Sequence, residues 1–327
     1  MPQPARFSEP AGFHWSSFKN AKGADIRFGH VAPEGPLKGT VVIVGGFKEP
    51  IEKYHEVTAD MLSRGYAVWL MDWRGQGGSS RYIPHSEKAH HEGYDEQIET
   101  LHRFMTSVVD TKNQPVHLMA HSMGAHTGLR YLKEHPGVFD SAMITAPMFD
   151  ISTGAIPKPL ARQMAKFAKT GNYLDKYVPG GADWQENKED ILKNHLTSDP
   201  RRFEMIKALF QDNPQLRLGD PTYGWVWHTF QSIDVLSQED YLKSIKTPIL
   251  MEISGNEKVV IRAASERASQ LLPDCRRVDI DEARHEIWME RDSLRMRWLA
   301  AVDQFMQERR AAHLSAKKCA PTKPPAA

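Results

Sequence analysis

The sequence predicts an α/β protein whose doubly wound, mostly parallel sheet is interrupted by a helical insertion. Short apolar runs alternate with segments in which apolar residues recur at helical spacing, as expected when strands and helices form separate layers. This alternation stops near Asp150 and resumes at Ile249. In addition, Ser122 lies at a turn between an apolar run and a helical segment. These three observations predict the order of the elements described next.

Four strands are expected in the first part of the chain, because each apolar run is short and bounded by turn residues. They cover residues 40–44, 67–71, 116–120 and 141–145. Helical spacing predicts helices after the first three strands, over residues 51–62, 94–108 and 123–134. The last of these helices should end before His135-Pro136, because the residue before a proline avoids helical geometry.

Residues 151–236 are expected to form a helical lid inserted into the core, because they contain few strand-like runs. The core then has two parts, residues 1–150 and residues 237–310. The second part contains strands at 249–253 and 277–280, a helix near 261–272, and a final helix whose apolar residues are Leu294, Trp298, Val302, Phe305 and Met306. Residues 311–327 are rich in Lys, Ala and Pro without apolar periodicity, and we expect them to be disordered.

The composition excludes several classes of protein. The 327 residues include 42 Lys and Arg against 41 Asp and Glu, which gives a formal net charge of +1. Nucleic-acid-binding domains are usually clearly basic, so nucleic acid is not an expected partner. Two cysteines, Cys275 and Cys319, are too few for a disulfide framework or a multi-cysteine zinc site. No apolar run approaches the ~18 residues of a membrane span, and no signal peptide is visible, so we expect a cytoplasmic protein.

Ser122 is the candidate nucleophile. It lies in the sequence Ala120-His121-Ser122-Met123-Gly124, between a predicted strand and a predicted helix. A serine on such a turn is held in a strained conformation with its hydroxyl above the strand ends. The small residues Ala120 and Gly124 let the strand and the helix pass closely, although Ala120 stands where the G-x-S-x-G pattern has glycine.

A serine hydroxyl needs a base that takes its proton, and the base needs an orienting carboxylate. His285 is the candidate base, because it lies in the loop after the last predicted strand and can reach over the sheet to Ser122. The candidate acid is Glu257, the only carboxylate in the loop 254–260 that follows the preceding strand. Asp150 is the alternative acid, because some proteins of this architecture carry the acid after the strand that ends there.

Two backbone N–H groups are candidates for stabilising an oxyanion. The N–H of Met123 opens the helix that follows Ser122 and faces the same space. The second donor is expected in the loop after the first strand, where Gly45-Gly46 let the backbone approach a substrate. Phe47 N–H is the predicted donor there.

One further segment carries a family resemblance: Asp72-Trp73-Arg74-Gly75-Gln76-Gly77-Gly78-Ser79 resembles a D-x-R-G-x-G-x-S turn. Together with the turn at Ser122, it makes residues 26–307 resemble the α/β-hydrolases, in the serine-hydrolase branch of bacterial lysophospholipases and monoacylglycerol lipases. Three stretches, residues 51–54, 196–200 and 221–225, are more similar to the bacterial lysophospholipases. The chain departs from the family at Gly45, where His is common, and at Glu257, where Asp is common.

The resemblance implies hydrolysis of carboxylic esters through an acyl-enzyme, without a metal ion or an organic cofactor. The expected substrate is a small amphiphilic ester of a single acyl chain, a lysophospholipid or a monoacylglycerol. A carboxylesterase of short-chain or xenobiotic esters is the alternative, and a hydrolase-fold binding protein without catalysis is a more distant one. A dehalogenase or epoxide hydrolase is disfavoured, because it would carry Asp at the position of Ser122.

The insertion is expected to shape the substrate pocket and to act as a lid. Its aromatic residues include Tyr173, Tyr177, Trp184, Phe210, Tyr223, Trp225, Trp227 and Phe230. At least half of these should form its own small core. Residues 157–170 combine an apolar stripe of Leu160, Met164 and Phe167 with a basic stripe of Lys158, Arg162, Lys166 and Lys169. Such a helix either contacts anionic lipid peripherally, at the inner membrane surface, or packs its apolar face on the core.

Overall fold

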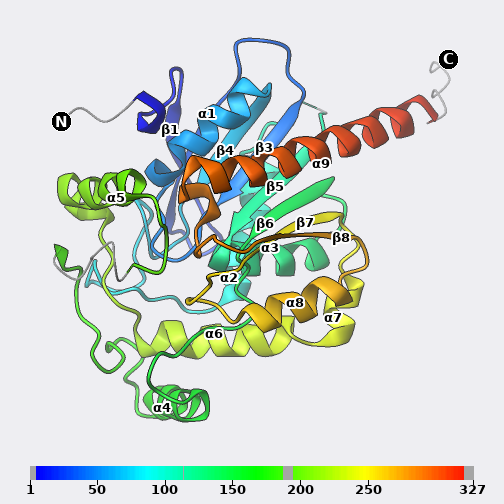
Figure 1. Cartoon of the computed structure of the whole chain (residues 1–327). Coiled ribbons are helices and arrows are strands. Elements are labelled where there is room, and N and C mark those ends of the chain that lie inside the picture. Colours follow the sequence, from blue (N-terminus) through cyan, green and yellow to red (C-terminus); the bar gives the residue numbers. More distant parts are fainter. Residues whose placement is uncertain (1–4, 113, 187–193, 320–327) are drawn as a thin grey trace, which may run out of the picture.

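The computed structural model describes residues 5–112, 114–186 and 194–319, and Figure 1 shows a central sheet with helices on both faces. The strands found there are β1 (His14–Lys19), β2 (Asp25–Val31), β3 (Gly39–Val44), β4 (Tyr66–Met71), β5 (Val116–His121), β6 (Ser141–Thr145), β7 (Ile249–Ser254) and β8 (Cys275–Ile280). They form one sheet in the order β1-β2-β4-β3-β5-β6-β7-β8. The β1–β2 and β2–β4 pairs are antiparallel, and every pair from β4 to β8 is parallel. The predicted fold class, an α/β protein with a mostly parallel sheet, is confirmed.

Two helical layers cover the sheet (Figure 1). The helices α1 (His55–Ser63) and α9 (Asp292–Cys319) pack on one face, and α2 (Tyr94–Ser107), α3 (Ser122–Glu134) and α8 (Arg262–Leu271) pack on the other. In β3, Val41 and Ile43 pack in the apolar core on the side of α1 and α9. Val42 and Val44 pack in the core on the side of α2, α3 and α8. Because successive side chains of a strand face opposite sides, a strand buried on both faces is a continuous apolar run. This is why β3 to β7 were visible in the sequence.

The antiparallel hairpin of β1 and β2 was not predicted. All six side chains of β1 are at least partly exposed, so the strand has no apolar run that would mark it. In the first half of β2 only alternate residues, Ile26 and Phe28, are deeply buried. This alternation is the pattern of a strand near the edge of a sheet. β8 also begins at Cys275, two residues before the predicted strand at 277–280.

The C-terminal residues correct another expectation. Residues 311–327 were expected to be disordered, but α9 continues to Cys319, while residues 320–327 lie outside the described part of the chain. Ala311, Ala312 and Leu314 are strong helix formers, and a helix of such residues needs no apolar stripe. His313 also bonds to Asp140 through its Nδ1, at 2.9 Å from Oδ1.

The chain between β6 and β7 contains α4 (Lys158–Thr170), α5 (Pro200–Asp212), α6 (Tyr223–Leu236) and the short α7 (Glu239–Ser244). Figure 1 shows α4 beside α6 at the side of the molecule away from α1 and α9. Helix α6 is joined to the core layer through hydrogen bonds between buried side chains. Tyr94 of α2 bonds to Thr229 at 3.1 Å, and His126 of α3 bonds to Ser232 at 2.6 Å.

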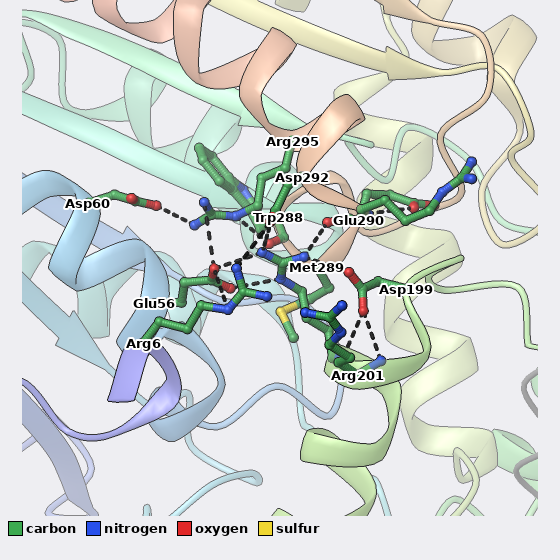
Figure 2. A network of polar contacts seen from close by, with 12 residues as sticks. Arg6, Glu56, Asp60, Asp199, Arg201, Trp288, Met289, Glu290, Asp292 and Arg295 are labelled. Carbon is green, nitrogen blue, oxygen red and sulfur yellow. Dashed lines mark hydrogen bonds and ion pairs between the residues drawn. The ribbon is translucent and has the colours of Figure 1, made fainter. Parts of the chain in front are cut away.

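Helix α5 is connected to the other face of the core by one buried arginine, Arg202. Figure 2 labels the partners of this arginine, among them Glu56, Asp199 and Asp292. The Arg202 side chain is fully buried, and it donates hydrogen bonds to Glu56 of α1 at 2.7 and 2.8 Å. It also donates to Asp292 at the start of α9 at 2.6 Å, and to Asp199 and the carbonyl oxygen of Glu290 at 2.8 Å each. Asp199 in addition caps the N-terminus of α5. A single guanidinium therefore joins the insertion to both helices of one layer.

Replacing Arg202 should destabilise the protein strongly. We expect Arg202→Met to lower the free energy of unfolding by about 3–5 kcal/mol, because the buried carboxylate of Glu56 would lose both of its hydrogen bonds to Arg202. Only the longer contacts with Arg6 at 3.8 Å and Arg295 at 3.9 Å would remain. The neighbouring Arg201 is exposed, and Arg201→Met should change stability by less than about 0.5 kcal/mol. Urea unfolding of both variants checks this prediction, and equal losses in the two would contradict it.

Candidate active site

Ser122 lies at the junction of β5 and α3, where the chain turns sharply. Its φ angle of 51° is in the left-handed region, which costs a non-glycine residue about 1–3 kcal/mol. The turn is possible because Gly124 has no side chain: a Cβ there would lie 2.4 Å from the carbonyl oxygen of Gly45 and 2.5 Å from that of Val44. The close contact between α3 and the end of β3 thus holds the serine at the carboxyl edge of the sheet.

The structure brings Ser122, His285 and Glu257 together. The Ser122 hydroxyl donates to Nε2 of His285 at 2.9 Å, and the Nδ1–H of His285 donates to Oε2 of Glu257 at 2.7 Å. The three residues follow β5, β8 and β7, so their loops meet at the same edge of the sheet. The other oxygen of Glu257 accepts the N–H groups of Val259 at 2.7 Å and Val260 at 3.2 Å. The carboxylate is therefore held in one orientation by its own loop.

The electrostatics of this group favour a basic imidazole beside an ionised carboxylate. Burial alone would lower the pKa of His285, but the charge and hydrogen bond of Glu257, together with Glu286 and Glu49, raise it above the ordinary value. Burial alone would raise the pKa of Glu257, but His285 and the two backbone N–H donors lower it. The pair can thus hold a proton on the imidazole when one is taken from Ser122.

Asp150, the alternative acid, has other partners. Its carboxylate pairs with Lys158 at the start of α4 and accepts the N–H of Ile151 at 2.9 Å. The Nδ1 atom of His285 points to Glu257 instead. The geometry therefore favours Glu257 over Asp150 as the orienting carboxylate.

The residues that carry the two candidate oxyanion donors lie close to each other. Phe47 and Met123 line a small hollow of about 10 Å³. The loop before Phe47 approaches Ser122 closely, because a Cβ on Gly46 would lie 3.0 Å from the Cβ of Ser122. The Phe47 ring also packs against Trp225 of α6 in a tilted arrangement, with ring centroids 4.6 Å apart and an interplanar angle of 49°. Both donors therefore lie on elements that pass next to Ser122.

Two residues that the sequence had not singled out hold this loop. Trp73 Nε1 donates to the carbonyl oxygen of Gly45 at 2.8 Å, and Gln76 Nε2 donates to that of Gly46 at 2.7 Å. The Gly46 carbonyl and the Phe47 N–H belong to one trans peptide, so they point in opposite directions. Gln76 therefore directs the Phe47 N–H. The only signal in the sequence was that both residues belong to the turn at residues 72–79, which resembles the D-x-R-G-x-G-x-S turn. That resemblance did not assign a role to either residue.

The insertion contacts the loop that carries His285. The backbone N–H of His285 donates to the carbonyl oxygen of His195 at 3.3 Å, and that of Glu286 donates to Leu196 at 2.8 Å. Arg284 reaches the same segment through a 2.6 Å bond to the carbonyl oxygen of Asn194. The stretch 196–200, which resembled the lysophospholipases in sequence, thus begins within these contacts.

Ser122 and His285 open into a pocket of about 530 Å³. One wall is apolar and comes mainly from the insertion, through Trp184, Phe203, Ile206, Phe210 and Leu218. The lining also includes polar residues, among them Lys48, Asn194, His195 and Asp220. Of the eight aromatic residues noted in the insertion, Trp184 and Phe210 line this pocket, while Phe230 is buried in the core beside α2 and α3.

Residues 35–292 match the family described as serine aminopeptidase, S33. The chain belongs to this family of α/β-hydrolases. It is 31% identical over 277 residues to lysophospholipase L2 of Escherichia coli (strain K12), covering 81% of this chain and 79% of the relative. It is 28% identical over 280 residues to a probable lysophospholipase L2 of Haemophilus influenzae, covering 84% and 86%.

Solved structures agree in fold. A soluble variant of monoglyceride lipase from Saccharomyces cerevisiae superimposes with a TM-score of 0.73 at 17% identity, over 94% of this chain and 98% of that one. A thermostable carboxyl esterase from Bacillus coagulans gives 0.69 at 17% identity, over 92% and 100%. The chain is thus an esterase- or lipase-like hydrolase. Among the described residues, no helix has the length and apolar content needed to cross a bilayer.

The identity of the acid can be tested through the pH profile. Because the pKa of His285 is raised, kcat/KM of the wild type should fall to half at a pH above about 6.5, as the imidazole becomes protonated. Glu257→Gln removes the charge that raises this pKa, so the acid limb should move to lower pH. The maximal rate should also fall, by up to about 10⁴-fold, because the imidazole loses its orientation.

Asp150→Asn is the matched control. It should leave both the acid limb of the pH profile and the maximal rate nearly unchanged. Steady-state kinetics on a soluble nitrophenyl ester between pH 5 and 9 provide the measurement. A crippled Asp150→Asn beside an active Glu257→Gln would show that the acid has been assigned to the wrong residue.

Proposed function

We propose that this chain is a serine hydrolase that cleaves the carboxylic ester of single-acyl lipids, lysophospholipids above all, through an acyl-enzyme. One observation carries the proposal: a serine, a histidine and a glutamate are hydrogen-bonded in series, and the first two line a pocket whose other residues are partly apolar and partly charged. Its volume of about 530 Å³ is within the range of about 300–1,000 Å³ that is typical of small-molecule sites.

The proposed reaction uses the candidate triad in two stages. Ser122 Oγ attacks the acyl carbonyl carbon while Nε2 of His285 takes its proton, and Glu257 stabilises the resulting imidazolium. The N–H groups of Phe47 and Met123 receive the oxyanion of the tetrahedral intermediate. The intermediate expels the alcohol, which takes the proton from His285. A water molecule, deprotonated by His285, then attacks the acyl-enzyme. Collapse of this second intermediate releases the fatty acid, and His285 returns the proton to Ser122 Oγ.

The mixed lining of the pocket supports an amphiphilic substrate. Its apolar residues suit an acyl chain, and its polar residues include a pair of opposite charges. Lys48 Nζ lies 3.8 Å from the Asp220 carboxylate, with their side chains 31% and 33% exposed. A zwitterionic phospholipid head group carries a phosphate and an ammonium that match these two charges. This feature favours a lysophospholipid over a short neutral ester, as do the names of the relatives in the two bacteria.

We further propose that residues 151–236 form a lid that touches a lipid surface through α4. Leu160 and Phe167 are 48% and 71% exposed, so the apolar stripe points away from the core. Ala165 and Ala168 are the buried positions of the helix. The basic stripe is partly used within the molecule, because Lys158 pairs with Asp150 and Arg162 with Asp234. Apolar insertion, more than charge, would then hold the protein peripherally at the inner membrane surface.

The substrate class can be tested with a matched series of esters. We expect purified protein to hydrolyse long-chain lysophospholipids with a higher kcat/KM than short-chain nitrophenyl esters. Ser122→Ala should abolish both this activity and labelling by a fluorophosphonate. Lys48→Met should reduce kcat/KM for a lysophospholipid by about ten- to a hundredfold, since bonds to charged groups contribute about 1.5–3 kcal/mol.

A monoacylglycerol with the same acyl chain lacks the phosphate and is the control, because its hydrolysis should respond little to Lys48→Met. A preference for short esters would instead identify a carboxylesterase. Absence of both hydrolysis and labelling in the wild type would favour a binding protein on the same fold.

The contact of α4 with lipid can be tested separately. Leu160→Ser combined with Phe167→Ser should weaken sedimentation with anionic vesicles by at least about tenfold, because burying one such side chain contributes about 1.5–3 kcal/mol. Hydrolysis of a soluble nitrophenyl ester should be unchanged. Met296 of α9 is 54% exposed, and Met296→Ser is the matched control for loss of an exposed apolar side chain. Equal vesicle binding by all three proteins would contradict the proposed contact.

A further inference from the structure

A second group of charged residues is buried beside the candidate triad. Lys53, Glu49 and Glu286 have side chains that are only 6%, 4% and 8% exposed. The Lys53 ammonium contacts both carboxylates, and it lies 2.6 Å from Oε1 of Glu286. Tyr54 donates its hydroxyl to Glu49 at 2.6 Å. Because buried ion pairs contribute little to stability relative to apolar packing, this cluster calls for another explanation.

The two carboxylates belong to two different parts of the site. Glu49 accepts the N–H of Gly46, the residue before the candidate donor Phe47. Glu286 directly follows His285. Lys53 comes from a third element, the 3-10 helix η2 (Ile51–Tyr54) that precedes α1. One ammonium group therefore connects the loop of the oxyanion donor with the loop of the base.

The cluster contains residue types that could bind a metal ion, but the Lys53 ammonium already lies among them. Oxygen and nitrogen atoms of Glu49, His121 and Glu286 lie within 4.8 Å of one another. The Lys53 ammonium contacts both carboxylates in this group, which is the place that a metal ion would need. Burial lowers the pKa of His121 to about 3, so its ring is neutral and adds no second positive charge. Lys53 is thus the cation of this group, shared between the two carboxylates.

The peptide of Gly46 shows what this connection achieves. Gln76 holds the carbonyl oxygen of Gly46, and Glu49 holds its N–H, so both sides of the residue are fixed. Glycine has no side chain that could hold its own backbone in place. An oxyanion donor contributes only when it lies about 2.7–3.1 Å from the developing charge. The placement of Glu49 therefore affects the placement of Phe47, one residue further on.

We propose that Lys53 is a positioning residue that, through Glu49 and Glu286, holds the Phe47 N–H in register with His285. The inference rests on the proposed roles of these two groups in ester hydrolysis. In the free protein, the bridge sets the distance between the atom that takes the proton and the atom that receives the oxyanion. Lys53 lines the same pocket as Ser122 and His285, and it acts on them through the two carboxylates that it contacts.

Lys53→Met is the main test, because it keeps an apolar stem of similar length and removes the ammonium. On a soluble nitrophenyl ester we expect kcat to fall about 10²–10³-fold, as for loss of one oxyanion donor, with KM changed less than about twofold. Lys53→Arg should restore at least a tenth of the wild-type kcat. Glu52→Gln is the control from the same turn, since Glu52 pairs with Arg27 instead, and its kcat should be unchanged.

Glu286→Gln cuts the same bridge from the other side and keeps the test decisive if Lys53→Met does not fold. Its rate is compared on the plateau above the acid limb, where a change in the pKa of His285 no longer matters. There it should also lose kcat. The double variant should lose less than the product of the two single losses, because both cut one connection. A purely structural role would lower the melting temperature and leave kcat on the plateau unchanged.

The outcomes separate this inference from the proposed function. If the wild type neither hydrolyses esters nor reacts with a fluorophosphonate, the proposed function itself fails. If the wild type is active and folded Lys53→Met or Glu286→Gln keeps its kcat, the positioning role is overturned while the hydrolase remains. Multiplicative losses in the double variant would likewise overturn a shared bridge.

Discussion

The close contact between α3 and the end of β3 is the constraint on which the rest of the site depends. Gly124 lies so near the carbonyl oxygens of Val44 and Gly45 that no side chain fits between them. This contact permits the left-handed conformation of Ser122, and it also brings the loop after β3 against the serine. One backbone approach therefore places both the nucleophile and the neighbouring donor loop. The histidine and the carboxylate then need only to reach the same point from β8 and β7.

The parts of this arrangement that follow from periodicity could be predicted from the sequence. Strands β3 to β7 are buried on both faces and appear as apolar runs, whereas the exposed β1 does not. The carboxyl ends of parallel strands meet at one edge of a sheet. The position of Ser122, Glu257 and His285 after three such strands was therefore enough to expect them in contact, and their hydrogen bonds agree with this expectation.

The buried charges could not be predicted in this way. Glu49, Lys53 and Arg202 are residue types that usually face solvent, and nothing in their local spacing indicates otherwise. Their burial depends on partners that are distant in sequence: Glu56 precedes Arg202 by 146 residues, and Glu286 follows Lys53 after more than two hundred. One of these residues, Lys53, lies in a stretch that resembles the bacterial lysophospholipases, but the resemblance assigned it no role. The same holds for Gln76, whose function depends on which carbonyl it meets.

The guanidinium of Arg202 has a consequence for how such proteins can be recombined. Helix α5 supplies part of the apolar wall of the pocket, which makes the insertion an obvious unit to exchange between relatives of different specificity. Yet this helix carries the arginine that neutralises Glu56 of α1 and meets Asp292 of α9. If the insertion alone were exchanged, the core would keep Glu56 and Asp292 but lose the arginine with which they pair. The unit of exchange therefore includes carboxylates on the core, far from any substrate.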